Sequence, residues 1–330
     1  MKKIIILILL VFCKPKSTIP SFSSLLKTHP AARMENYPKQ KLEERIFNLP
    51  KLQNEFIHEL NIIDGIENIP APSTDFLLMK EKMDLIFKNS NPKILKILDK
   101  YVLGIYFSEN LGTTGLTSFV YDKNLKPVGG IIFIDSNLVK LSGNEWISYK
   151  ENTVFIQGKY KLKIEIDNGN SKFSALEYIL LHELGHIVSV VDGIVPDFTL
   201  EKRNFKSFPF FHGVWSEEKV MTELSTKYPE LKKIKFYSKP ELKLDVDALE
   251  IYSILEVSPF PTVYSTINAD DHFAESFVSY LHTLVGKKPW RLTIINERGE
   301  ANSFENGISK ERCKLEREFM EKWFRNAIQD

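Results

Sequence analysis

The stretch Leu181-His182-Glu183-Leu184-Gly185-His186 has the pattern H-E-x-x-H and lies in an apolar run. Residues four apart share one face of an α-helix, so the imidazoles of His182 and His186 can converge on a single metal ion. A catalytic zinc site has three protein ligands and a water whose pKa the metal lowers. Glu183, one step round the helix, is placed to take a proton from that water and pass it to a leaving amine. The stretch therefore predicts one catalytic Zn²⁺ held by His182 and His186, with Glu183 as the general base.

The residues around this motif predict a helix. Apolar residues recur at helical spacing from about Ser174 onward, at Leu176, Ile179, Leu180, Ile187 and Val188. Ser171 or Ser174 is placed to cap its start, and Asp192-Gly193 is typical of a helix end. The motif alone does not identify the third metal ligand, which must come from another part of the chain.

A second informative stretch runs from Pro261 to Phe277 and predicts another helix. Asn268 or Asp270 is a suitable N-cap, and apolar residues then continue at helical spacing. Asp271 and Glu275 are four residues apart, so both carboxylates face the same way. This helix therefore offers two candidates for the third ligand.

Taken together, the two stretches resemble the gluzincin zinc metallopeptidases, particularly the catalytic domain of anthrax toxin lethal factor and the clostridial Pro-Pro endopeptidases. The resemblance rests on H-E-x-x-H followed by a tyrosine, a short turn and a helix of the form D/E-x-F-A-E-x-F, which here covers about 182–282. It implies that Asp271 is the third zinc ligand, that Glu275 orients the site, and that Tyr264 donates to the oxyanion. The sequence departs from the family by having Asp271 where the family has Glu. Because aspartate has the shorter arm, Glu275 as ligand with Asp271 behind it remains an alternative.

Other histidines and acidic residues are weaker ligand candidates. Asp270 and His272 flank the proposed third ligand, and His212 lies in an aromatic-rich loop between Phe205 and Trp215. His282, about two turns beyond Glu275, is predicted to be a packed histidine.

The expected fold class is α+β, with the zincin-like arrangement of two lobes around a metal cleft. Residues 38–172 are predicted to form an N-terminal lobe of helices (39–63 and 74–103) followed by a small, mostly antiparallel sheet. Its expected strands are 115–121, 130–135, 153–156 and 162–166. Within it, Gly129-Gly130-Ile131-Ile132 is a candidate edge strand for pairing with an extended peptide substrate, with an ordinary core strand as the alternative. Residues 173–330 are predicted to form a mainly helical catalytic lobe.

The N-terminus predicts export. Residues 1–13 combine Lys2-Lys3 with a short apolar run, as in a secretory signal peptide. Leu10-Val11-Phe12-Cys13 resembles a bacterial lipobox, in which the cysteine is lipidated, although Phe12 replaces the usual small residue. The alternative is an ordinary signal peptide that is cut further on. Residues 14–37 are expected to be a tether, so the protein is predicted to be either lipid-anchored in the bacterial cell envelope or secreted.

Composition limits the range of functions. The chain has 44 Lys and Arg against 43 Asp and Glu, a formal charge of +1, which gives no electrostatic case for nucleic acid as a partner. Its two cysteines, Cys13 and Cys313, predict no internal disulfide in a mature chain. The motifs predict a zinc-dependent endopeptidase whose partner is a protein or peptide substrate, with the membrane reached only through an N-terminal lipid. Two alternatives are a non-catalytic, surface-tethered binding protein on the same scaffold and a zinc hydrolase of cell-wall peptide.

Overall fold

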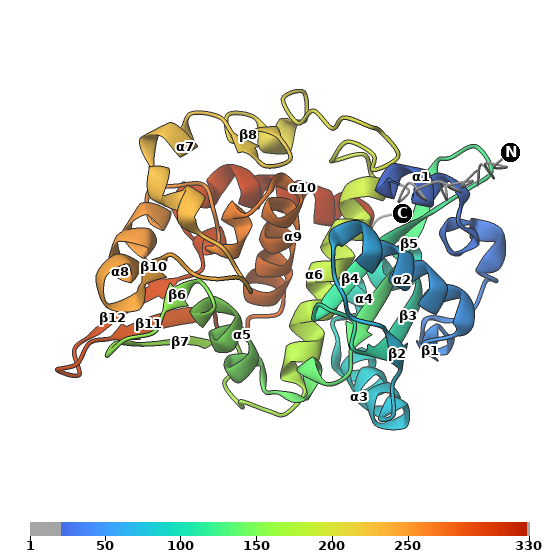
Figure 1. Cartoon of the computed structure of the whole chain (residues 1–330), viewed down its shortest axis with the longest axis horizontal. Helices are drawn as coiled ribbons and strands as arrows, with labels where there is room; N and C mark the ends of the chain where they lie inside the picture. The colour runs from blue at the N-terminus through green and yellow to red at the C-terminus, as the bar shows by residue number, and fades with distance from the viewer. Residues whose placement is uncertain (1–20, 329–330) are drawn as a thin grey trace, which may run out of the picture.

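The computed structural model describes residues 21–328 and has an α+β architecture (Figure 1). The helices are α1 (Phe22–Thr28), α2 (Lys51–Asp64), α3 (Phe76–Asn89), α4 (Pro92–Tyr101), α5 (Gly143–Asn152), α6 (Ser174–Val191), α7 (Leu224–Lys227), α8 (Leu244–Leu255), α9 (Ala269–Ser279) and α10 (Lys314–Ala327). Short helical turns are η1 (Pro30–Ala32), η2 (Met34–Asn36), η3 (Leu42–Glu44), η4 (Leu138–Lys140), η5 (Pro209–Phe211), η6 (Pro229–Lys233), η7 (Tyr264–Thr266), η8 (Tyr280–Val285), η9 (Gly307–Ser309) and η10 (Glu311–Cys313). The expected α+β class is therefore confirmed.

The main sheet lies in the N-terminal half and is mixed. Its strands run in the order β1 (Ile46–Asn48), β3 (Val102–Glu109), β5 (Pro127–Asp135) and β4 (Gly115–Tyr121), with β2 (Ala71–Pro72) paired to β3. The β1–β3 and β3–β5 pairs are parallel, whereas β4 and β2 are antiparallel to their neighbours. The expectation of a mostly antiparallel sheet is wrong, because the chain enters β1, β3 and β5 from the same side.

The proposed edge strand lies in the interior of this sheet. Gly129-Gly130-Ile131-Ile132 belongs to β5, which pairs with β3 on one side and β4 on the other. Residues 129–132 therefore have no open edge, because the two neighbouring strands take up the backbone hydrogen bonds of β5. Within the described residues, the end of the strand order beside α6 is β4 instead (Figure 1).

The second set of strands joins the two halves of the chain. β7 (Lys161–Glu165), β11 (Arg291–Ile295) and β12 (Ala301–Glu305) form an antiparallel sheet, and β6 (Phe155–Ile156) pairs with β10 (Leu242–Lys243). β8 (Trp215–Glu217) and β9 (Val220–Met221) form a separate hairpin. The expected strands at 153–156 and 162–166 thus lie outside the main sheet, and the predicted lobe boundary at 172 fails because β7 pairs with residues 291–295.

The expected long helices are interrupted. The 39–63 segment forms η3 and strand β1 before α2 begins, and the 74–103 segment divides into α3 and α4 and then continues as β3. Pro92 begins α4, where its missing amide proton is tolerated and where its ring prevents the preceding turn from remaining helical.

The tether prediction is wrong for the part of it that the structure describes. Residues 21–37 form α1, η1 and η2, and Leu26, Ala31 and Ala32 are buried. The Tyr37 hydroxyl donates to the Ala31 carbonyl oxygen over 2.6 Å, which fixes this segment against the fold. Its small and apolar residues pack into the core, although they lack helical periodicity. The predicted signal peptide and Cys13 lie outside the described residues.

Helix α6 runs through the centre of the molecule (Figure 1). It packs against β4 and β5 on one side and against α9 on another. Its length and apolar composition would suit a membrane span, but 78% of it is buried inside the protein, as in a core helix. It ends at Val191 with Asp192 as C-cap, as predicted, while its N-cap is Phe173 rather than a serine.

Candidate metal centre

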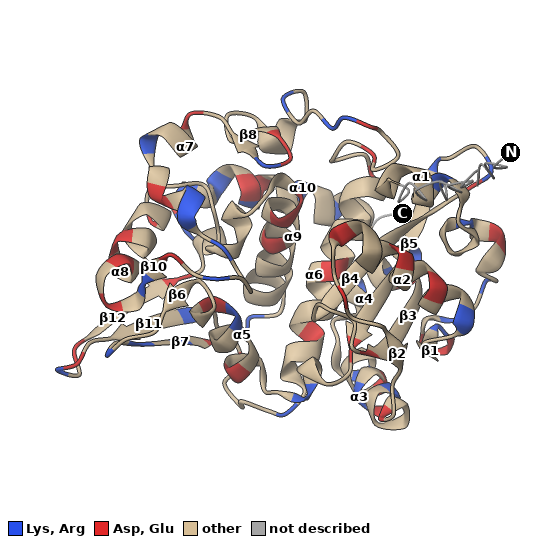
Figure 2. Ribbon diagram, viewed as in Figure 1, with Lys and Arg blue, Asp and Glu red and all other residues tan. Residues whose placement is uncertain are grey.

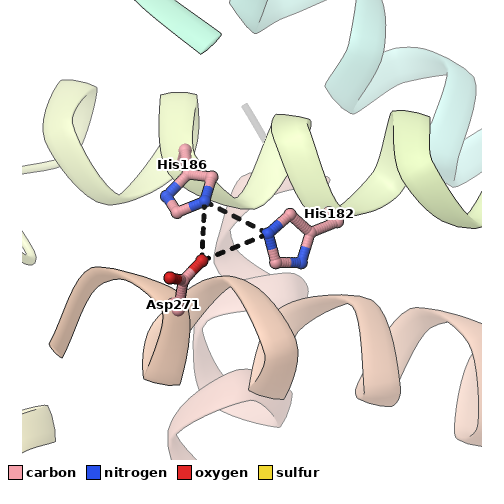
Figure 3. A group of neighbouring side chains, drawn as sticks. All are labelled: His182, His186 and Asp271. Atoms are coloured by element: carbon pink, nitrogen blue, oxygen red, sulfur yellow. Dashed lines mark hydrogen bonds and ion pairs between the residues drawn. The ribbon is translucent and has the colours of Figure 1, made fainter. Parts of the chain in front are cut away.

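Helices α6 and α9 bring three ligand atoms together (Figure 3). The Nε2 atoms of His182 and His186 lie 3.2 Å apart. Oδ1 of Asp271 lies 3.5 Å from Nε2 of His182 and 3.5 Å from Nε2 of His186. His182 and Asp271 are buried and His186 is partly buried, so this group is enclosed by the two helices.

The three distances match the size of a tetrahedral metal site. Two ligands bound at about 2.0–2.1 Å and separated by the tetrahedral angle lie about 3.3–3.4 Å from each other. The observed separations of 3.2, 3.5 and 3.5 Å are within a few tenths of an ångström of that value. The group can therefore hold a metal ion without rearrangement of either helix.

Asp271 is fixed by the N-cap of its own helix. The Asn268 side chain accepts a hydrogen bond from the Asp271 amide over 2.7 Å, and its Nδ2 donates to Asp271 Oδ2 over 2.7 Å. Oδ1 remains to face the two imidazoles. Burial opposes ionisation of Asp271, but His182 and His186 outweigh it and hold the pKa of this carboxyl well below its ordinary value.

Glu275 contacts the opposite nitrogen of His182. Its Oε1 lies 3.0 Å from Nδ1 of His182, in a close ion-pair contact rather than a well-aligned hydrogen bond. Its Oε2 accepts from the Thr262 hydroxyl over 2.7 Å, and Lys150 Nζ lies 3.4 Å from Oε1. Of the two carboxylates, Asp271 is thus the one that converges with both Nε2 atoms, and Glu275 orients His182 from behind.

Close packing of the helices brings the short aspartate within reach. A β-carbon added at Gly185 of α6 would lie 3.0 Å from the Ala274 Cα of α9 and 3.2 Å from Phe277 Cδ1. Glycine and alanine therefore face each other where the helices approach. This contact offsets the missing methylene of Asp271 relative to the glutamate of the family that the motifs resemble.

Glu183 contacts strand β4. Its Oε2 accepts from the Thr117 hydroxyl of β4 over 2.8 Å. Gly115, also on β4, lies so close that an added β-carbon would be 2.6 Å from Glu183 Oε1. Glu183 and Gly115 border a cavity of about 50 Å³, together with His182, Lys150 and Tyr264. A water or a substrate group in this cavity would contact the carboxylate directly.

Tyr264 lies beside His182, one of the candidate metal ligands. Its ring centroid is 5.8 Å from that of His182, and Lys150 Nζ lies 3.4 Å from the Tyr264 ring centroid. Burial, and then the Asp271 carboxylate, raise the pKa of Tyr264 well above its ordinary value. The phenol therefore keeps its proton and is available as a hydrogen-bond donor.

His182 is protonated in the metal-free protein. Burial lowers the tendency of this imidazole to take a proton, but the Asp271 and Glu275 carboxylates outweigh burial and raise its pKa to about 9. Desolvation likewise opposes the charge on Glu275, yet Lys150 and His182 lower its pKa to about 2. A metal ion that binds here must displace the His182 proton.

The other predicted residues lie outside this group. Asp270 forms a two-point ion pair with Arg203, with N–O distances of 2.7 and 2.7 Å. His272 is buried, accepts from the Trp215 indole at Nδ1 over 3.1 Å, and has its pKa lowered to about 3 by burial. His212 is exposed, and His282 is a packed histidine beside the Ile166 and Pro289 carbonyl oxygens, as predicted.

Sequence reasoning missed Lys150, Thr117 and Thr262. Lys150 comes from α5 and reaches Glu275 across 125 residues of sequence. The only local pattern near Lys150 is the capping box that predicts the start of α5. There the Ser142 side chain accepts from the Glu145 amide, and the Glu145 carboxylate accepts from the Ser142 amide. Thr262 lies inside the second stretch but has no spacing rule that would single it out.

Charged residues of both signs are spread over the described part of the chain, residues 21–328. Figure 2 shows Lys and Arg interspersed with Asp and Glu over both halves of the ribbon, in agreement with the formal charge of +1. No protein-family model matches this chain, and no curated protein or solved structure is significantly similar to it. The resemblance to gluzincins therefore stays a prediction from the motifs.

Proposed function

We propose that this protein is a zinc-dependent endopeptidase with a zincin-like arrangement of its lobes. The observation that carries the proposal is the convergence of His182 Nε2, His186 Nε2 and Asp271 Oδ1, with Glu183 lining the same cavity as His182. Two imidazoles and one carboxylate at tetrahedral separation are a donor set typical of catalytic zinc. A zinc ion bound there would supply an activated water and polarise a substrate carbonyl.

The protein's own groups would move the proton and bind the developing charge. Glu183, held by Thr117, would accept a proton during attack on the carbonyl and return it to the leaving amine. The protonated Tyr264 would donate to the oxyanion, where a preorganised donor contributes most to the rate. Glu275 would hold the His182 ring in position through Nδ1.

Strand β4 is the proposed binding element for an extended peptide. It is last in the order of the main sheet, and its residues Gly115 and Thr117 contact Glu183. A peptide paired along its outer edge would pass beside the carboxylate. This role replaces the one predicted for Gly129-Gly130-Ile131-Ile132.

The intact base favours an enzyme over a binding protein, because a zinc site that only stabilises the fold needs no carboxylate beside its water position. Hydrolysis of cell-wall peptide is the remaining alternative. We also propose that the protein is exported by its N-terminal segment and acts at the bacterial cell envelope or outside the cell.

Replacement of the base tests the proposal. Glu183→Gln should keep zinc and lose at least about a hundredfold of peptide hydrolysis, the lower range for general acid–base catalysis. Glu177→Gln is a matched control on the same helix, since Glu177 pairs with Lys288 instead of the metal ligands. Turnover is measured on a peptide library and on cell-wall peptide fragments, with zinc content determined for each protein. Absence of metal-dependent turnover on every substrate would refute the proposal that the protein is an enzyme. Activity on cell-wall peptide alone would refute the proposal that it is an endopeptidase.

A further inference from the structure

The cavity beside Glu183 and His182 is small and has bulky walls. Its volume is about 50 Å³, and side chains from both halves of the chain line it, among them Trp146, Ile179, Tyr237 and Tyr264. A protein cavity of about 150 Å³ holds one benzene ring. The cavity beside Glu183 has about a third of that volume, so it accommodates roughly two non-hydrogen atoms.

Strand β4 and helix α6 confine the cavity on one side. A β-carbon added at Gly115 would lie 2.6 Å from Glu183 Oε1 and 2.9 Å from Ile179 Cγ2. Both distances are well below the roughly 3.5–4.0 Å of an ordinary contact between carbon atoms. The cavity can therefore widen on this side only if the main sheet and α6 separate.

Packing also fixes two of the aromatic walls. Trp146 is buried, and its ring centroid lies 5.9 Å from that of Tyr178. The Tyr264 ring packs edge-on against Phe236, with 4.8 Å between the ring centroids, and Lys150 Nζ lies over its face. Protein interiors are close-packed, so neither ring can move aside without displacing its neighbours.

Tyr237 contributes another wall from a loop. The residue is 51% exposed, and its φ of 53° lies in the left-handed region, which an aromatic residue rarely adopts. Its amide donates to Thr153 Oγ1 over 3.1 Å, and its ring centroid lies 6.5 Å from that of Tyr149. Backbone strain of this kind persists where the surrounding structure holds a side chain in place, and it is concentrated at functional sites.

We propose that the protein cleaves peptides beside a glycine, alanine or serine whose side chain enters this cavity, and that Trp146 and Tyr237 exclude larger side chains. The inference rests on the proposed peptidase function, because His182 and Glu183 line the same cavity. A peptide bond attacked at this centre lies next to both residues, so one of the two amino acids that flank the bond faces the cavity. The alanine methyl and the serine hydroxymethyl fit its volume, whereas the leucine and phenylalanine side chains exceed it.

Hydrolysis of a matched peptide series by the zinc-loaded, full-length protein tests the proposal. Cleavage of a peptide library, followed by mass spectrometry, identifies the bond that is cut. Peptides then carry glycine, alanine, serine, leucine or phenylalanine on each side of that bond in turn. At one of the two positions kcat/KM should be at least about tenfold higher for the three small residues, since one methylene in a pocket changes it by about 10–200-fold. Equal kcat/KM across the series at both positions would overturn this inference alone, whereas absence of hydrolysis would overturn the peptidase function as well.

Substitutions locate the pocket. Tyr237→Ala removes one wall and Trp146→Phe shortens another, so in each variant the preference for alanine over leucine should fall at least about fivefold. Tyr237→Phe retains the ring and should retain the preference. Tyr149→Ala is the matched control, because Tyr149 is a 58% exposed tyrosine that contacts Tyr237 and does not line the cavity. An unchanged preference in both Tyr237→Ala and Trp146→Phe, with zinc content verified, would contradict the assignment, and so would an equal loss in Tyr149→Ala.

Discussion

Gly185→Ala tests whether close helix packing is what allows an aspartate to serve as the third ligand. The added β-carbon would lie 3.0 Å from Ala274 Cα and 3.2 Å from Phe277 Cδ1. Carbon atoms in contact are normally about 3.5–4.0 Å apart, so α6 and α9 must separate by about half an ångström. Asp271 Oδ1, now 3.5 Å from each Nε2 atom, would move to about 4 Å, beyond the roughly 3.4 Å that a tetrahedral zinc requires.

The expected effect is much larger on metal binding than on folding. Overpacking costs about 1–3 kcal/mol, and the better helix propensity of alanine returns about 1 kcal/mol, so the net loss of stability is about 0–2 kcal/mol. A ligand displaced by a fraction of an ångström should weaken zinc binding by about 10–100-fold, the range seen when support for a ligand is lost. The protein should thus remain folded and release zinc to a weaker chelator.

A longer ligand arm should restore the site. In Gly185→Ala/Asp271→Glu the extra methylene compensates for the wider helix separation, whereas Asp271→Glu alone should place the carboxylate too close and weaken zinc binding. The two substitutions should therefore be strongly non-additive. Zinc affinity is measured for all four proteins by competition with graded chelators, alongside thermal unfolding. Wild-type affinity in Gly185→Ala, or a double variant no tighter than Gly185→Ala, would refute the argument from helix distance.

Three further outcomes are expected. Asp271→Ala should lose zinc during purification, whereas Glu275→Ala should retain it with about 10–100-fold lower affinity; the reverse order in zinc-to-protein ratios would exchange their roles. His182 has its pKa raised to about 9 in the metal-free protein, so zinc must compete with a proton below that pH. Zinc affinity, measured by chelator titration, should therefore rise by up to about tenfold per pH unit below pH 9 and level off above it. An affinity that does not change with pH would contradict this expectation. Labelled palmitate should be incorporated into the full-length protein and not into the Cys13→Ser variant. If neither protein is labelled, the lipobox prediction is wrong and secretion without a lipid anchor remains.

Local sequence patterns predicted the elements that hold the site. The 3.6-residue periodicity gave α6 and α9 their correct type, because their apolar faces are continuous and one end of each carries a predicted cap, Asp192 in α6 and Asn268 in α9. β4 matches its predicted range of 115–121, since β-branched and aromatic residues follow a glycine and end at a turn. The convergence of His182 and His186 followed from the same spacing, because both residues lie on one helix.

Long-range pairing explains what the sequence did not predict. β3 follows α4 without a turn signal, so its first residues extend an apolar helical pattern that only tertiary pairing breaks. β5 is central because the chain turns back after β4 and places β5 between β3 and β4. A burial pattern alone does not distinguish such a central strand from an edge strand. Lys150 reaches Glu275 from a different helix, and spacing rules apply only within one element.

Charge balance explains why the site as a whole favours a divalent cation. Glu183, Asp271 and Glu275 place three buried carboxylates around two imidazoles, and Lys150 supplies one buried ammonium. Two negative charges then lack a buried counterion. In the metal-free protein the proton on His182 offsets part of this excess, which is why its pKa rises to about 9 despite burial. A divalent ion that replaces this proton would neutralise the excess and meet imidazoles already oriented by Glu275, so metal binding should release protons to the solvent.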